Sequence, residues 1–196
     1  IRAFSEDTQR YYSLMPTSGA PTMLISGIPM HRIKETDPHK DTLEKIKAAK
    51  PIFGPVLDTA TGLGYTAIAA AVKADHVTTI EFDPTALKVA RQNPWSQQLF
   101  DNPKITQRLG DSYDIAPEFD DGSFARVIHD PPMFNLAGHL YGEDFYATLY
   151  RVLRRNGKLF HYIGDPDSRS GANVTRGAIR RLLAVGFRTV QRRPRA

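Results

Sequence analysis

A short apolar run that ends in an acid and two glycines constrains this chain more than any other feature. Residues 56–64 read Val-Leu-Asp-Thr-Ala-Thr-Gly-Leu-Gly, so Asp58 closes the apolar run and Gly62 and Gly64 follow it. Glycine is needed where the backbone adopts a positive φ or a ligand comes close, and the amides that open the next helix suit a polar or anionic group. The stretch predicts a strand that feeds a nucleotide-binding turn; the alternative is a turn that needs glycine only for its bend.

Three later strand-like segments also end in polar residues. The segments are residues 77–82, 105–109 and 124–129, and the polar residues at their ends are Glu81, Asp111 with Ser112, and Asp130. An acid about twenty residues beyond the glycines can accept both hydroxyls of a ribose in a doubly wound fold. Because ligands of open α/β sheets bind outside the carboxyl ends of the strands, the four strand ends predict one crevice.

In the order and spacing of these motifs, residues 51–190 resemble the class I S-adenosylmethionine-dependent methyltransferases. The resemblance implies S-adenosyl-L-methionine as the cofactor. The first motif would hold its methionine part, Glu81 would bind the ribose hydroxyls, Phe82 would flank the adenine, and Asp111 would accept the adenine amine, with Ser112 beside it. The cofactor-binding residues implied by the resemblance are Asp58, Thr61, Gly62, Gly64, Glu81, Phe82, Asp111 and Ser112.

The segment after the fourth strand is similar to the Asp/Asn-Pro-Pro-Tyr/Phe motif of amino-group methyltransferases. It reads Asp-Pro-Pro-Met-Phe, so Met133 occupies the usual aromatic position and the ring comes one residue late. The resemblance implies methyl transfer to a nitrogen, with the acceptor held at this turn. The catalytic residues expected on this basis are Asp130, Pro131, Pro132, Phe134 and His129. For His129, a buried structural histidine is the alternative to a catalytic base.

A second resemblance, to the spermidine synthase family, lies in the N-terminal region and after the fourth strand. Residues 22–32 read as a β-hairpin before a helix at residues 39–49, and residues 140–146 are similar to the segment after that family's catalytic loop. The family carries an acid between the glycines, where this chain has Leu63, and a substrate-binding acid in the hairpin, where it has Ser26. Since polyamines are recognised chiefly by charge, the loss of these two acids argues against aminopropyl transfer with decarboxylated S-adenosylmethionine, which stays as the alternative function.

Helical segments alternate with the strands and predict an α/β fold. They are residues 65–73, 85–91, 143–153 and 171–185, with further strands expected at 158–164 and 186–192 and a loop at 92–102. This alternation implies a doubly wound, mainly parallel Rossmann-like sheet with helices on both faces. Residues 1–50 would form an N-terminal hairpin and helix extension that is a candidate lid, and residues 51–196 the cofactor-binding methyltransferase domain.

Charge is divided unevenly along the chain. Residues 151–196 carry a net charge of +10, whereas residues 1–150 carry −5. The arginines of the basic part predict contact with nucleic acid phosphates, and a non-catalytic nucleoside- or RNA-binding module is a further alternative. The other interpretation is a solvated face, because no aromatic residues alternate with these arginines to stack on bases. The methyl acceptor stays open between RNA, protein and a small molecule.

Composition narrows the remaining classes. The chain has no cysteine, which excludes disulfides and thiolate chemistry, and no apolar run approaches the length of a membrane span. Its histidines His31, His139 and His161 do not show metal-ligand spacing, so no metal is expected. These features lead us to expect a cytoplasmic enzyme without membrane contact.

Overall fold

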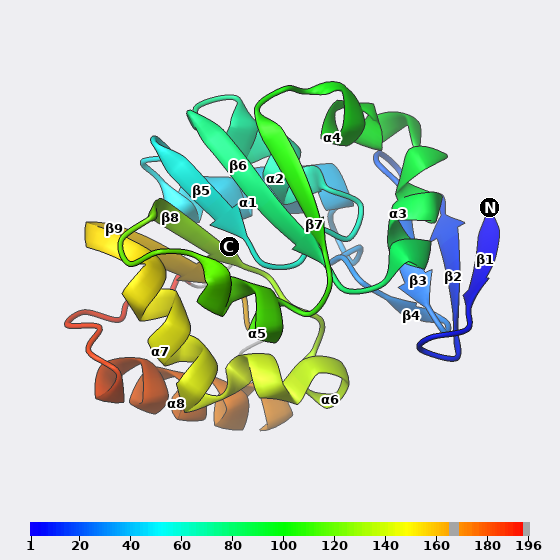
Figure 1. Ribbon diagram of the computed structural model, residues 1–196. Helices are drawn as coiled ribbons and strands as arrows, with labels where there is room; N and C mark the ends of the chain where they lie inside the picture. The colour runs from blue at the N-terminus through cyan, green and yellow to red at the C-terminus, as the bar shows by residue number, and fades with distance from the viewer. Residues whose placement is uncertain (165–168, 194–196) are drawn as a thin grey trace.

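Five parallel strands form the centre of the protein (Figure 1). The computed structural model describes residues 1–164 and 169–193. The strands are β5 (Pro55–Asp58), β6 (His76–Glu81), β7 (Ile105–Leu109), β8 (Phe124–His129) and β9 (Leu153–His161). Their order is β7-β6-β5-β8-β9, so the chain runs outward from β5 to β7 and then returns to the other side at β8. The predicted α/β fold is confirmed, and the reversal between β5 and β8 marks the expected ligand crevice.

Helices cover both faces of this sheet (Figure 1). The first face packs against α1 (Pro38–Ala49), α2 (Tyr65–Ala71) and α3 (Pro84–Arg91), and the second against α5 (Ser112–Ile115), α7 (Glu143–Val152) and α8 (Arg169–Ala184). Successive strand side chains point to opposite faces, so Val56 packs with the first set and Leu57 with the second. Both are fully buried, as expected for a parallel sheet covered on both sides.

The N-terminal region forms a second sheet, which lies beside α3 (Figure 1). It has four antiparallel strands in sequence order, β1 (Arg2–Ser5), β2 (Arg10–Met15), β3 (Thr22–Ile25) and β4 (Ile28–Pro29). The hairpin predicted at residues 22–32 is confirmed, with Ser26 and Gly27 at positive φ in its turn. Strands β1 and β2 were not predicted. Tyr12 and Met23 of this sheet share a core with Val56 and Leu63, so the two sheets are packed together.

Short helices complete the connections. They are η1 (Pro94–Ser96), α4 (Gln97–Asp101), η2 (Ala116–Glu118), α6 (Phe134–Ala137) and η3 (Gly138–Tyr141). The loop predicted at residues 92–102 is therefore wrong, because Asn93 caps the first of these helices and Leu99 anchors the second in the core. Within the described residues, no helix combines the length and the apolar character that a membrane crossing requires.

Two strand predictions also differ from the structure. The strand predicted at residues 158–164 begins earlier, at Leu153. Asn156, at φ +64, does not form a turn before the strand but lies within it, where the pairing with β8 is irregular. The strand predicted at residues 186–192 is absent. Gly186 at φ +115 turns the chain out of α8, and Phe187 then packs edge-on against Tyr150 of α7, with 5.1 Å between ring centroids. This contact holds the segment over α7, and no strand pairing with β9 forms.

Candidate functional site

A cavity of about 380 Å³ lies beyond the carboxyl ends of the central strands. Loops after β5, β6, β7 and β8 line one side, and the N-terminal sheet closes the other. Six of the eight predicted cofactor-binding residues line it, namely Thr61, Gly62, Glu81, Phe82, Asp111 and Ser112. Of the predicted catalytic residues, Asp130, Pro131 and Pro132 line it. The strand ends therefore form one crevice, which the N-terminal sheet turns into a cavity.

The two glycines of the first turn have different surroundings. Gly62 adopts φ +51, and a Cβ placed there would meet only the methyl group of Met23, at 4.0 Å across the cavity. Gly64 adopts φ +77, and a Cβ there would come within 2.7 Å of Leu99. Both positions need glycine for their backbone conformation. Gly62 leaves room for a ligand, whereas Gly64 lies outside the cavity lining and leaves room for α4.

Glu81 ties the first turn to the loop after β6. Its Oε2 accepts a hydrogen bond from the amide of Gly62 at 2.7 Å, and its Oε1 accepts one from the amide of Asp83 at 3.1 Å. Burial raises the pKa of Glu81 to about 7, although these amides favour the ionised form. The N-terminal sheet reaches the same loop, since Thr8 donates its hydroxyl to Asp83 Oδ2 at 2.8 Å.

Asp58 lies beneath the first turn and does not line the cavity. Its Oδ2 accepts hydrogen bonds from the hydroxyls of Thr66 at 3.1 Å and Thr79 at 3.0 Å. Complete burial raises the pKa of this carboxyl to about 7, with the hydrogen bonds from Thr79, Thr66 and the Ala60 amide opposing the shift. Asp58 therefore joins β5, β6 and α2 under the turn.

Asp111 and Ser112 lie at the end of β7. Asp111 caps α5 by accepting the amide of Tyr113 at 2.8 Å, and its other carboxylate oxygen lies 2.9 Å from His139 Nε2. Ser112 donates its hydroxyl to the Thr59 carbonyl at 2.6 Å. His139, which the sequence did not single out for this site, thus links the Asp111 carboxylate to η3.

The turn after β8 carries Asp130 at the opposite end of the cavity. Its Oδ2 accepts a hydrogen bond from Lys45 Nζ at 2.7 Å, while Oδ1 takes no hydrogen bond from the described residues. Tyr141 donates its hydroxyl to the carbonyl of Pro132 at 3.1 Å. Phe134 packs against Tyr141, with 5.5 Å between ring centroids, and is not among the residues that line the cavity.

His129 is fully buried beneath this turn. Its Nδ1 lies 2.7 Å from the Thr59 hydroxyl and its Nε2 lies 3.0 Å from the Leu140 carbonyl. Since a carbonyl only accepts, the proton is on Nε2 and Nδ1 accepts from Thr59. Burial, with His161 nearby, holds the pKa of His129 well below its usual value. The ring is therefore neutral and connects β5 to the segment after the turn.

Several residues of the site come from parts of the chain that the motifs did not cover. Arg10, Tyr12, Met23 and His31 line the cavity from the N-terminal sheet and its connections, and Lys45 reaches it through Asp130. The signal for Lys45 was a charged residue in the buried stripe of a helix, with Thr42, Ile46 and Ala49 on the same face. His31 had no comparable signal.

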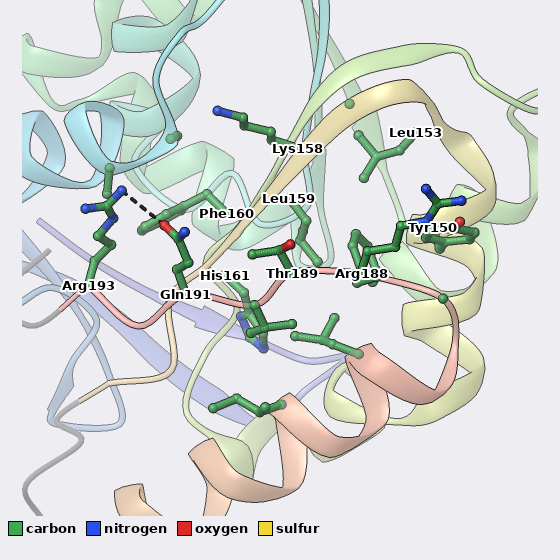
Figure 2. A pocket seen from close by; sticks show the side chains of 18 of the residues that line it. Tyr150, Leu153, Lys158, Leu159, Phe160, His161, Arg188, Thr189, Gln191 and Arg193 are labelled. Atoms are coloured by element: carbon green, nitrogen blue, oxygen red, sulfur yellow. Dashed lines mark hydrogen bonds between the residues drawn. The ribbon is translucent and has the colours of Figure 1, made fainter.

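A second hollow, of about 1500 Å³, lies between β9 and residues 186–193 (Figure 2). Its basic lining residues are Lys50, Arg151, Arg154, Arg155, Lys158, Arg188, Arg192 and Arg193. Arg151 is paired with Asp121 at 2.6 Å, and Arg193 donates to Gln191 at 3.3 Å. Two further arginines of residues 151–196 do not line it: Arg181 donates to the Tyr141 carbonyl, and Arg195 lies outside the described residues. We call this hollow the basic groove.

Comparison with known proteins agrees with the geometry. A family model described as a methyltransferase domain matches residues 56–157, slightly more than half of the chain. A protein of Methanocaldococcus jannaschii named only as uncharacterized is 50% identical over 184 residues, which cover 93% of this chain and 63% of that protein. A polyamine aminopropyltransferase of Sulfolobus acidocaldarius is 30% identical over 94 residues, 46% of this chain and 31% of the relative.

Solved structures resemble this chain closely in fold although their sequences differ from it. Spermidine synthase in complex with the transition-state analogue AdoDATO superposes with a TM-score of 0.79 at 19% identity, over 94% of this chain and 64% of that chain. The predicted resemblance to both methyltransferases and spermidine synthases is confirmed. The chain spans less than two thirds of the length of each of these relatives.

Proposed function

Because the chain belongs to the methyltransferase domain family, we propose that it transfers the methyl group of S-adenosylmethionine to a nitrogen acceptor held at Asp130. One observation carries the proposal. The cofactor motif residues and the Asp-Pro-Pro turn, which are far apart in the sequence, line the same cavity. A cofactor and an acceptor bound there would face each other in a space of about 380 Å³.

The cofactor end of the cavity fits a nucleoside. The backbone at Gly62 leaves open space where any other residue would place a Cβ, which suits close approach of a ligand. Glu81 offers a carboxylate for ribose hydroxyls, Asp111 offers one for the adenine amine, and the exposed ring of Phe82 offers a face for the base. Asp58 supports the turn from beneath and is assigned a positioning role.

The acceptor end orients the nitrogen. S-adenosylmethionine supplies an electrophilic methyl group on its sulfonium sulfur when it is bound. In the transfer, an N–C bond forms as the S–C bond breaks, and the nitrogen loses one proton to solvent. Asp130 Oδ1 accepts a hydrogen bond from the acceptor N–H, which directs the nitrogen lone pair towards the methyl group. The prolines preset the carbonyl positions of the turn, and His129 holds the segment that follows it.

Phe134 contributes to the turn by packing on Tyr141, whose hydroxyl holds the Pro132 carbonyl. We therefore propose that Phe134 and His129 act as positioning residues. In this proposal, the acceptor touches Asp130, Pro131 and Pro132.

Titration calorimetry with S-adenosylmethionine, S-adenosylhomocysteine and decarboxylated S-adenosylmethionine tests the cofactor. We expect the first two to bind and the third to bind more weakly. Tighter binding of the decarboxylated form would move the protein to aminopropyl transfer, the second candidate, which the similarity to spermidine synthase supports. Asp130→Ala should abolish turnover on an identified acceptor while cofactor binding is kept; full turnover in this variant would refute the role of Asp130.

Nucleic acid contact is a separate proposal for the basic groove. Its lysines and arginines suit a row of phosphates, which supports an RNA acceptor over a small molecule. Binding of a labelled RNA should weaken steeply with salt, and Arg154→Gln with Lys158→Gln should reduce that salt dependence. Binding that is unaffected by both changes would exclude the groove.

A further inference from the structure

A lysine is buried between two carboxylates behind the acceptor end of the cavity. Lys45 Nζ lies 2.7 Å from Asp130 Oδ2 and 3.0 Å from Asp41 Oδ2, and the ring centroid of Tyr162 is 4.1 Å away. The side chains of Lys45 and Asp41 are 3% and 1% exposed, whereas that of Asp130 is 18% exposed and lines the cavity. The ammonium group thus donates a hydrogen bond to Asp130, forms an ion pair with Asp41 and packs over the Tyr162 ring, and it meets the cavity through Asp130.

Lys45 is the cation that the two carboxylates share. Burial alone would lower the pKa of Lys45, but Asp130 and Asp41 outweigh burial and raise the pKa above its usual value, so the lysine stays charged. Burial raises the pKa of Asp41, although the charges of Lys45 and Arg32 oppose the shift. A carboxylate that already has a buried ammonium partner attracts a second cation weakly, because the attraction to one charge is offset by repulsion from the other.

Apart from Arg10, the residues that the N-terminal region and α1 contribute to the cavity wall carry no charge. Met23, Met30, Thr42 and Pro131 are uncharged, and desolvation, with the nearby charge of Lys45, lowers the pKa of His31 to about 3. His31 is neutral at pH 7. Among the described residues at this end, Asp130 is the one carboxylate that lines the cavity, and Lys45 neutralises it.

We propose that Lys45 determines acceptor specificity: by pairing with Asp130, it excludes cationic amines such as polyamines and leaves a site for an uncharged N–H donor. This inference rests on the proposed function, since it assumes that the acceptor binds at Asp130. The paired Oδ2 fixes the carboxylate, and Oδ1, which takes no hydrogen bond from the described residues, accepts one from the acceptor. An uncharged amino or amide nitrogen supplies that bond and needs no further carboxylate at this end.

Spermidine is the probe that tests this inference, because it is a polycation and its binding needs no knowledge of the acceptor. Calorimetry would compare the wild type with Lys45→Gln and with Asp41→Asn/Lys45→Gln. The double variant protects the experiment from misfolding, since it removes the buried carboxylate that Lys45→Gln leaves unpaired. We expect both variants to bind spermidine at least about tenfold more tightly than the wild type. Asp130→Asn added to either variant should remove the gain.

Lys47→Gln is the matched control, because Lys47 lies on the same helix with its side chain 70% exposed and carries the same charge outside the cavity. It should not change spermidine binding. Wild-type affinity equal to that of the variants, or a double variant with a native melting transition and no gain, would overturn the inference. Parallel titrations with S-adenosylhomocysteine separate the two proposals. Absence of that binding in the wild type would count against the proposed function, whereas the spermidine comparison tests the role of Lys45.

Discussion

The two ends of the cavity are built from different parts of the chain. The cofactor end around Gly62, Glu81 and Asp111 comes from loops that follow consecutive central strands. The acceptor end around Asp130 also uses the N-terminal sheet and, behind it, Lys45 of α1. The cofactor end follows from strand order, which the fold shares with its relatives, whereas the acceptor end follows from how distant segments pack. If the proposed function holds, this difference leads us to expect acceptor specificity to reside in residues outside the shared motifs.

The largest effect is expected when the acceptor end is broken at Lys45. Lys45→Gln leaves Asp41 and Asp130 without their buried partner, and should lower the free energy of unfolding by about 3–5 kcal/mol. Urea unfolding measures the change. Asp41→Asn/Lys45→Gln should recover part of the loss. A loss below about 1 kcal/mol in the single variant would contradict a buried, charged triad.

A substitution at the cofactor end should change the affinity for the cofactor. Glu81→Ala removes the carboxylate that joins the Gly62 and Asp83 amides, and should weaken S-adenosylhomocysteine binding about a hundredfold. Calorimetry measures it, and Glu118→Ala, which removes an exposed carboxylate paired with Arg108, is the control. Unchanged affinity in Glu81→Ala would remove Glu81 from the cofactor site.

The two glycines sharpen the comparison within the cofactor end. Gly64→Ala places a methyl group against Leu99 at positive φ and should cost about 2 kcal/mol of stability. Gly62→Ala has open space, so it should cost about 1 kcal/mol in backbone strain but should weaken cofactor binding more. Thermal unfolding and calorimetry on both variants separate these effects. Equal losses in both measurements would show that the glycines have one shared role.

The last expected effect is a pH dependence. Because the pKa of Glu81 is raised to about 7, its contribution to stability is fully present below about pH 4.5 and is lost as the pH rises to 7. The free energy of unfolding of Glu81→Gln should therefore rise relative to that of the wild type by about 1 kcal/mol per pH unit between pH 5 and 7. His31, His129 and His161 have lowered pKa values and give the opposite slope, but they are common to both proteins. Denaturation at pH 5, 6 and 7 measures the difference, and a constant difference would contradict the raised pKa.

Local patterns in the sequence predicted the central sheet well. The segments that end at Asp58 and Glu81 and just before Asp130 are strands, because apolar and β-branched residues favour a parallel strand that is buried on both faces. The predictions failed where long-range packing decides. Strands β1 and β2 are stabilised by pairing across the sheet and with the core, and residues 186–193 pack on α7 through Phe187.

The site residues divide in the same way, into those that local patterns predicted and those that long-range packing decided. The sequence identified Asp130 and the residues around Gly62 because motif spacing places them at strand ends, and parallel strand ends meet at one edge of the sheet. It did not show that His129 points away from the cavity, since a histidine at a strand end can face either side.

The sequence by itself determined the α/β fold, the family and the strand ends that line the cavity, because strand-forming runs and glycine turns act over a few residues. The tertiary structure alone decided that Lys45, 85 residues from Asp130, is its partner, and that His139 pairs with Asp111. Such contacts join segments whose separation in the chain carries no local signal. They depend on the packing of α1, the N-terminal sheet and η3 around the central strands.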